Sequence, residues 1–238
     1  MGKMKNDGKR TVAAGILLLI FFAVWTVLIQ TVDVEVMGPE GTEVGLASVN
    51  LWFHKLTGVH FALYHVTDWL GLVPVFLCMV FGAVGLAQLI RRRSLWKVDK
   101  DLLLLGAYYG IVIAGYLLFE MVPVNYRPVL IEGRLEASYP SSTTLLVLSV
   151  MPTLAFQADR RIRHMLAKQT IKIFAAGFSV FMVAGRLISG VHWITDIIGA
   201  VLLSGGLYLV YEGVVTFIDE NEIETGGMSW NFMKNFRN

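Results

Sequence analysis

Residues 11–32 read TVAAGILLLIFFAVWTVLIQTV, an apolar run without a single charged residue. A helix advances about 1.5 Å per residue, so about 20 apolar residues are needed to cross the hydrocarbon core of a bilayer. The run therefore predicts a membrane-spanning helix. Its length, and the lack of a small-x-small cleavage site before Asp33, argue against a secretory signal peptide.

Further segments repeat this pattern along the chain. Uncharged runs occupy 69–90, 102–119 and 137–158, and two weaker segments, 172–191 and 197–218, carry few charges. We therefore expect an all-α integral membrane protein whose residues 11–218 form a six-transmembrane-helix bundle, with tails at 1–10 and 219–238. Glycines within these runs are expected to let helices approach closely, namely Gly82, Gly85, Gly106, Gly110 and Gly115.

The composition excludes several other classes of protein. Of 238 residues, 55% are hydrophobic and 16% are charged, and the mean hydropathy is +0.62. Soluble domains carry roughly 25% charged residues, and a nucleic-acid binder needs a basic surface. We therefore expect a bilayer, and no nucleic acid, as the partner. The single cysteine, Cys78, excludes an intrachain disulfide and a cysteine-based zinc site.

The distribution of basic residues predicts the orientation of the bundle. The segments 1–10, 91–100, 160–172 and 219–238 hold 16 of the 20 Lys and Arg residues. Because basic loops stay on the cytoplasmic side, both termini are expected in the cytoplasm and the other three connections outside. This arrangement suggests a bacterial plasma membrane.

The first outer connection contains an amphipathic pattern over about 40–66. Leu46, Val49, Phe53 and Leu56 recur at three- and four-residue spacing. Such a pattern is typical of a helix lying on the membrane surface, and equally of a cap packed over the helix ends.

Four ionisable residues lie at the outer ends of the expected spans: Arg127, Arg186, His192 and Asp196. Arginine binds phosphate oxygens through paired hydrogen bonds. His192 and Asp196 share a helix face if the sixth helix begins by His192, and a carboxylate bonded to one imidazole nitrogen leaves the other free to attack phosphorus. The set predicts phosphoryl transfer, although each residue alone could have a structural role.

The start of the fourth span adds a possible anion site. Ser141, Ser142 and Thr143 stand at its outer, amino-terminal end, where free N–H groups and the helix dipole favour an anion. Pro140 suits the first helical position.

These residues resemble the type 2 phosphatidic acid phosphatases, integral-membrane lipid phosphatases with the signatures Lys-x6-Arg-Pro, Pro-Ser-Gly-His and Ser-Arg-x5-His-x3-Asp. The chain has Arg127-Pro128 for the first, Pro140–Thr143 for the second, and Gly185-Arg186 followed at the family's spacing by His192 and Asp196 for the third.

The resemblance implies a phosphatase with its pocket on the outer side of the bundle. His192 would form a phosphohistidine and Asp196 would orient it. Arg127, Arg186 and the Ser141–Thr143 segment would hold the phosphate. Such an enzyme needs no metal or cofactor.

Three positions depart from the signatures. Glu120 replaces the lysine of the first motif, Gly185 replaces the serine of the third, and Thr143 replaces the histidine that protonates the departing alcohol in the family. General acid catalysis contributes roughly 10²–10⁴-fold in rate, so a plain monoester should be a poor substrate.

The loss of the acid histidine at position 143 leaves three possibilities open. The substrate could be a lipid diphosphate, such as a polyprenyl diphosphate, whose leaving group needs little protonation. Another group could supply the proton, with Glu120, Glu132, Glu136, His60 and His65 as candidates. Alternatively, the chain could be a catalytically weak binding or transport protein for phosphorylated lipids. A purely structural membrane subunit would require the third motif to arise by chance.

Overall fold

The computed structural model describes residues 6–235, with side chains through residue 222. Its helices are α1 (Asp7–Thr31), α2 (Ala47–Thr57), α3 (Phe61–Leu70), α4 (Leu72–Arg92), α5 (Lys100–Met121), α6 (Ser142–Arg161), α7 (Met165–Ile188) and α8 (Ile194–Asn235). The short 3-10 helices η1 (Pro39–Gly41) and η2 (Leu95–Lys97) lie in connections, and strands β1 (Glu35–Val36) and β2 (Glu43–Val44) form an antiparallel hairpin. The expectations for residues 1–5 and 236–238 fall outside the described residues.

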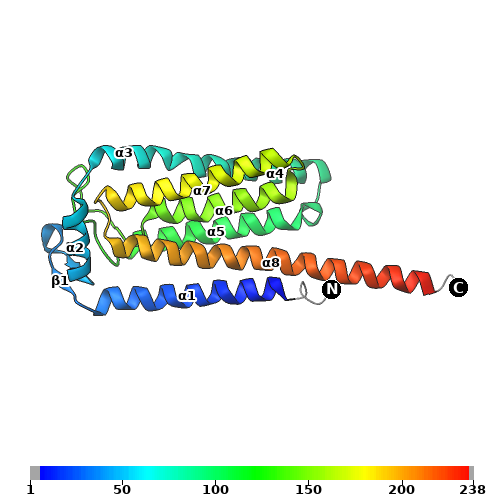
Figure 1. Ribbon diagram of the computed structural model, residues 1–238, viewed down its shortest axis with the longest axis horizontal. Coiled ribbons are helices and arrows are strands. Elements are labelled where there is room, and N and C mark those ends of the chain that lie inside the picture. The colour runs from blue at the N-terminus through cyan, green and yellow to red at the C-terminus, as the bar shows by residue number, and fades with distance from the viewer. Residues whose placement is uncertain (1–5, 236–238) are drawn as a thin grey trace.

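The long helices run side by side, with α6 among the others (Figure 1). α6 contacts α4, α5, α7 and α8. Its polar side chains find partners there: the hydroxyl of Thr153 lies 2.7 Å from that of Tyr109, and the amide of Gln157 donates to the hydroxyl of Tyr211 at 2.8 Å. The bundle is therefore built around a helix that is more polar than its neighbours.

Among the residues that the structure describes, five helical segments are long and apolar enough to cross a membrane: Asp7–Thr31, Phe61–Arg92, Lys100–Met121, Met165–Ile188 and Ile194–Glu222. The remaining expected span corresponds to α6, whose polar residues are compatible with a central position. The structure thus gives five candidate spans, and a sixth crossing by α6 stays a prediction.

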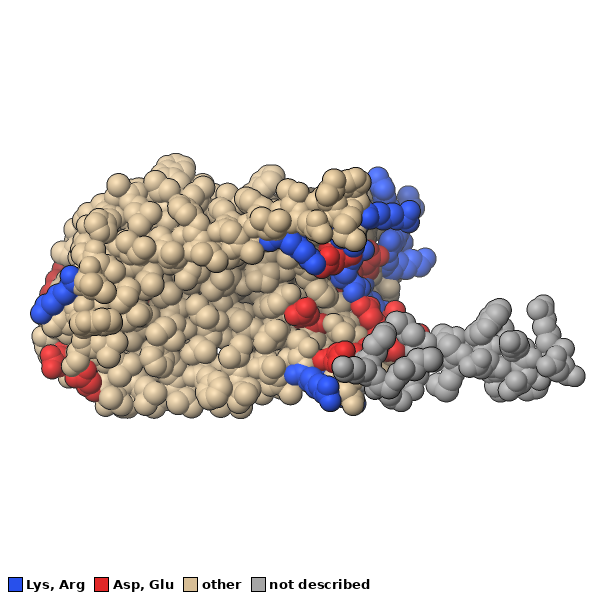
Figure 2. Space-filling view, in the orientation of Figure 1, with Lys and Arg blue, Asp and Glu red and all other residues tan. Residues whose placement is uncertain are grey.

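The lateral surface of the bundle is apolar. Large side chains such as Leu17, Phe76, Ile111 and Val180 are exposed on α1, α4, α5 and α7. Lys, Arg, Asp and Glu gather toward the two ends of the molecule (Figure 2). Such a surface suits a multi-pass membrane protein, because charges are costly at membrane depth.

Helices α1 and α8 approach each other closely. A Cβ added at Gly15 would lie 2.8 Å from the backbone oxygen of Gly206, and one added at Gly213 would lie 2.7 Å from the backbone nitrogen of Val12. The expectation for the glycines of α4 and α5 was wrong, because a Cβ at Gly82, Gly85, Gly106, Gly110 or Gly115 meets no described atom within 4 Å.

The outer connection forms two helices in place of one amphipathic segment. Gly58, with φ of 68°, separates α2 from α3. α2 lies across one end of the bundle (Figure 1), and the fully buried amide of Asn50 donates to the hydroxyl of Thr195 at 3.0 Å. This packing corresponds to the cap alternative.

Several element boundaries differ from expectation, and two of them bear on the site and the tail. α6 begins at Ser142 and not near 137, because Tyr139-Pro140 belongs to a connecting loop whose end, Ser141, donates its backbone N–H to the carbonyl of Asp196. Pro140 is therefore not the first helical residue. α8 continues to Asn235, beyond the expected end at 218.

Candidate active site

Two connections meet at the end of the bundle where α6 and α8 begin. The loop 122–141 carries Arg127, and the turn 189–193 carries His192. Arg186 stands in the last turn of α7 and Asp196 in the first turn of α8. All four side chains are buried, with exposed fractions of 7%, 3%, 1% and 0% for Arg127, His192, Arg186 and Asp196.

The imidazole of His192 lies between two guanidinium groups and a hydroxyl. Its Nε2 atom is 3.4 Å from Nη1 of Arg127 and 3.3 Å from Nη2 of Arg186. On the other side of the ring, Nδ1 is 3.1 Å from Oγ of Ser138. Because guanidinium groups can only donate, Nε2 must accept, and the proton of the neutral ring is assigned to Nδ1.

The charge state of His192 follows from its surroundings. Burial, and then the positive charges of Arg127 and Arg186, lower the pKa of His192 well below its usual 6.5. The imidazole is therefore neutral at pH 7, and Nε2 keeps the lone pair that a nucleophile needs.

Ser138 connects His192 to Asp196. The Ser138 hydroxyl donates to Oδ2 of Asp196, while the direct distance from Nδ1 of His192 to Oδ2 is 3.7 Å. The same carboxylate oxygen accepts the backbone N–H of Trp193 at 2.8 Å. The expected His192–Asp196 pair is thus brought together, but helix α8 begins after His192, and the orienting contact passes through a serine that sequence reasoning missed.

Each arginine has an acidic neighbour and shares an aromatic one. Nε of Arg127 is 3.1 Å from Oε2 of Glu136, and Nη1 of Arg186 is 3.6 Å from Oδ1 of Asp68. The guanidinium carbons lie 5.8 Å and 5.0 Å from the ring centre of Tyr64, within cation–π range.

Arg186 keeps unused donors in the site. Its Nε and Nη1 atoms are buried and make no hydrogen bond within the described part of the chain. Buried donors without acceptors are costly, and an oxyanion bound against the Arg186 guanidinium could accept from them.

The second-motif residues lie at the start of α6 with different surroundings. The Ser141 hydroxyl is fully buried and donates to Oγ1 of Thr144 at 3.1 Å, so it serves the helix start. Ser142 is half-buried, and Thr143 is 9% exposed. The structure thus brings Ser142 and Thr143 to the cavities described next, whereas Ser141 is engaged inside the helix turn.

Two cavities meet at Ser142 and Tyr116. A polar cavity of about 260 Å³ is lined by Arg127, Ser138, Glu120 and Glu136. An apolar cavity of about 540 Å³ runs between α4, α5 and α6 and is lined at its polar end by Asp68, Ser142 and Thr143.

The candidate proton donors separate by position. Glu120 and Glu136 line the polar cavity. Glu132, His60 and His65 are exposed, and Nε2 of His60 is 2.9 Å from the carbonyl of Thr57. These three residues line neither cavity.

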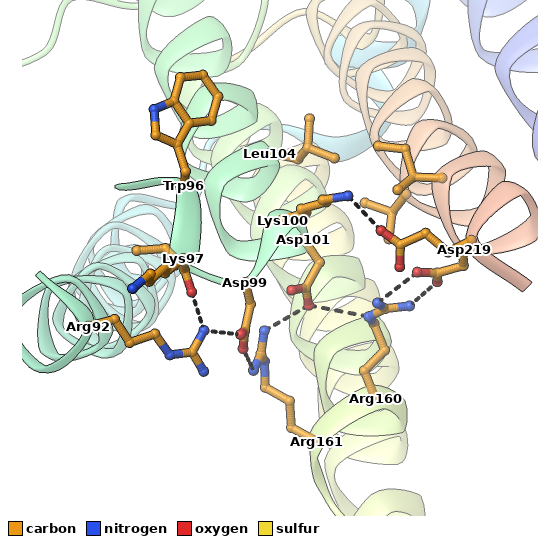
Figure 3. A pocket seen from close by; sticks show the side chains of 14 residues that line it. Arg92, Trp96, Lys97, Asp99, Lys100, Asp101, Leu104, Arg160, Arg161 and Asp219 are labelled. Carbon is orange, nitrogen blue, oxygen red and sulfur yellow. Dashed lines mark hydrogen bonds and ion pairs between the residues drawn. The ribbon is translucent and has the colours of Figure 1, made fainter. Parts of the chain in front are cut away.

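A further cavity, of about 550 Å³, lies at the opposite end of the bundle and is lined by side chains that form ion pairs (Figure 3). Asp101 of α5 lies 3.2 Å from Nε of Arg160 and 2.7 Å from Nη2 of Arg161, both on α6. Arg160 also pairs with Asp219 of α8 at 2.5 Å. These ion pairs connect helices α5, α6 and α8 and indicate a structural role for this end of the bundle.

Comparisons with known proteins give a family match and a fold likeness. Residues 119–217 match the PAP2 superfamily, a range that contains all three motif segments. The fold is similar to the crystal structure of a transmembrane PAP2-type phosphatidylglycerolphosphate phosphatase from Bacillus subtilis, with a TM-score of 0.62, 19% identity, and coverage of 84% of this chain and 94% of that one. At this identity the likeness shows the fold. No curated protein matches the chain.

Proposed function

We propose that this chain, which belongs to the PAP2 superfamily through residues 119–217, is a membrane lipid phosphatase that works through a phosphohistidine on His192. The observation that carries the proposal is the convergence of both guanidinium groups on Nε2 of His192, at 3.4 Å and 3.3 Å. A nucleophile and two cations suited to phosphate binding thereby face one small volume. Arg127 also lines the polar cavity, which shares Tyr116 and Ser142 with the apolar cavity.

Phosphate binding uses Arg127, Arg186 and the start of α6. The arginines supply permanent charge and planar pairs of donors. The first N–H groups of α6, from Ser142 onward, have no acceptor within the helix and add the positive end of its dipole. When an oxyanion enters, it replaces Nε2 as the acceptor of the guanidinium donors and frees that lone pair for attack.

The first chemical step is attack of Nε2 on phosphorus. A P–N bond forms as the bond to the leaving oxygen breaks, and positive charge develops on the imidazole. The hydrogen bond from Nδ1 to Ser138, and from Ser138 to Asp196, places a buried carboxylate where it stabilises that charge. The arginines stabilise the charge on the transferring phosphoryl group.

The absence of an acid histidine favours a substrate with a good leaving group, namely a lipid diphosphate such as a polyprenyl diphosphate. Thr143 stands at the motif position of the acid histidine, and a hydroxyl is too weak an acid to protonate a departing alkoxide. A lipid monophosphate leaves as a stable anion and needs no such proton.

The lipid chain fits the apolar cavity. This cavity of about 540 Å³ begins at Ser142 and Thr143 and continues past Val75, Ile113 and Leu146. A substrate held by its terminal phosphate at Arg127 and Arg186 would place its hydrocarbon along these side chains. The site would then face the outer leaflet of a bacterial plasma membrane, as the basic loops predict.

Phosphate release by the purified protein tests the proposal. Wild-type protein in detergent should release phosphate from a polyprenyl diphosphate, and His192→Ala should abolish the release. His65→Ala is the matched control, since His65 is exposed outside both cavities. Release that survives in His192→Ala would contradict the proposal.

A second candidate function is binding or transport of phosphorylated lipid without turnover. Thr143 and Glu120 favour it, because both remove a group that the family uses in the reaction. Lipid binding by the wild type with no phosphate release from mono- or diphosphates would support this function. The phosphatidylglycerolphosphate phosphatase activity of the similar Bacillus subtilis protein makes a lipid monoester the comparison substrate.

A further inference from the structure

Helix α3 delivers a carboxylate to the candidate site from a part of the chain outside the three motifs. Oδ1 of Asp68 lies 3.6 Å from Nη1 of Arg186, whose Nη2 lies 3.3 Å from Nε2 of His192. One guanidinium therefore reaches from the nucleophile to this carboxylate. The Asp68 side chain is 56% exposed, so the chain itself does not enclose it.

Two departures from the family signatures coincide with the packing of α3. A Cβ at Gly185 would lie 2.6 Å from Cγ2 of the fully buried Thr67, so the serine of the signature would not fit without a shift. A Cβ at Gly71 would lie 3.6 Å from Cγ2 of Thr143, which places the α3–α4 junction beside the lost histidine. Asp68 stands between these two contacts along the chain.

The hydrolytic step needs a base on one particular side of the phosphoryl group. Attack on phosphorus is in line, so the lipid leaves opposite Nε2, and the water that later attacks the phosphohistidine takes the same position. The lipid occupies the apolar cavity, and Asp68, Ser142 and Thr143 line the polar end of that cavity. A base for the water must therefore lie there.

The other carboxylates near the site are placed elsewhere. Glu120 and Glu136 line the polar cavity and not the apolar one, and Glu136 pairs with Arg127 at 3.1 Å. Asp196 is fully buried and holds Ser138 and the N–H of Trp193. Asp68 is the carboxylate at the leaving-group side within the described residues.

We propose that Asp68 is the general base for the water that hydrolyses the phosphohistidine on His192. This inference rests on the proposed function and adds a catalytic residue to it. An oxygen–phosphorus bond forms, the P–N bond breaks with its electron pair returning to Nε2, and the water proton passes to the Asp68 carboxylate. Phosphate then departs, and the proton is released to solvent.

Rapid quenching of Asp68→Asn with a polyprenyl diphosphate carrying ³²P in its terminal phosphate tests this role. Asn keeps the size of the side chain but cannot accept the proton. The variant should form phosphoenzyme at the wild-type rate and then accumulate acid-labile, alkali-stable label on protein, while turnover falls roughly 10²–10⁴-fold. Hydroxylamine, a nucleophile that needs no base, should discharge the label.

Two further variants serve as controls. Asp68→Glu should regain part of the turnover, since it restores a carboxylate. Glu35→Gln removes an exposed carboxylate in β1 and should behave as wild type. Thermal unfolding of all three variants shows whether Asp68→Asn is folded. If it is not, the kinetics of Asp68→Glu test whether Asp68 acts as the base.

Three outcomes overturn the inference. Normal turnover in Asp68→Asn would show that no base is needed there. Slower phosphoenzyme formation without accumulation would assign Asp68 to positioning Arg186. If Asp68→Asn is misfolded, a folded Asp68→Glu with reduced turnover but no phosphoenzyme above the wild-type level would show that the carboxylate does not act in the hydrolytic step. Absence of His192-dependent label in wild type would instead remove the proposed function itself.

Discussion

Ser138 shows what single side chains contribute to the candidate site. Its hydroxyl accepts from Nδ1 of His192 and donates to Asp196, so one residue fixes the tautomer of the proposed nucleophile and connects it to a buried carboxylate. The third motif predicted the two ends of this connection. Its centre comes from the loop before α6, which no spacing rule links to His192.

The charge state of His192 predicts the acid limb of the pH–activity profile. Burial and the two guanidinium groups lower its pKa well below 6.5. Protonation blocks Nε2, so activity is retained on acidification through pH 6.5 and falls only as the pH passes through the lowered pKa. Replacing Arg127 by Gln removes one positive charge, raises that pKa, and should move the limb to higher pH.

The measurement is kcat/KM against pH for the wild type and Arg127→Gln. The absolute rate of the variant will fall because a phosphate-binding group is lost, so the midpoint is the informative quantity. A midpoint that moves to lower pH in the variant would contradict the charge assignment.

Replacing Thr143 by histidine should raise the hydrolysis of one class of substrate. In Thr143→His an imidazole returns to the position of the family's acid, so hydrolysis of a lipid monoester should rise toward the roughly 10²–10⁴-fold that such an acid contributes. Hydrolysis of a lipid diphosphate should change far less, because its leaving group needs no proton. Phosphate release from both substrates measures the difference, and equal gains would refute the leaving-group argument.

At the scale of elements, the helix starts and their packing create the site. α6 and α8 both begin at it, and the Ser141 N–H donates to the Asp196 carbonyl at 3.2 Å, which fixes one helix start against the other. Helix α3 packs against α7 beside the site because Gly185 of α7 leaves room for Thr67 of α3. At the other end, the ion pairs of Asp101 with Arg160 and Arg161 tie α5 to α6.

The contact of α1 with α8 predicts a stability effect. In Gly15→Ala the new methyl would lie 2.8 Å from the backbone oxygen of Gly206, so the helices must separate. Overpacking of this kind costs about 1–3 kcal/mol. Gly110→Ala is the matched control, since its methyl meets no described atom within 4 Å.

Thermal unfolding in detergent should give a lower Tm for Gly15→Ala than for Gly110→Ala. Equal values for the two variants would show that α1 tolerates displacement from α8.

At the scale of the whole molecule, apolar flanks and charged ends suit a multi-pass membrane protein (Figure 2). The start of α1 lies at the end of the bundle away from the candidate site, and α8 runs toward that same end (Figure 1). The start of α1, the later turns of α8 and the basic loops thus lie opposite the site (Figure 1, Figure 2), as a pocket on the outer side would require.

Cysteine labelling tests the predicted orientation of the bundle in the membrane. After Cys78→Ala, Glu132→Cys in the loop before α6 should react with a membrane-impermeant maleimide in intact cells. Trp96→Cys, at a position 93% exposed in the loop after α4, should react only after the membrane is opened. The reverse pattern would place the site on the cytoplasmic side.

The sequence by itself determined the all-helical membrane architecture and the residues of the third motif. Hydropathy summed over about 20 residues is a local property, and the His192–Asp196 spacing keeps both near one helix start. Tertiary structure decided the central position of α6, the role of Ser138, the cap formed by α2, and the arrival of Asp68 beside Arg186. These depend on contacts between segments far apart in the chain, and such contacts are set by the way helices pack, which no local pattern encodes.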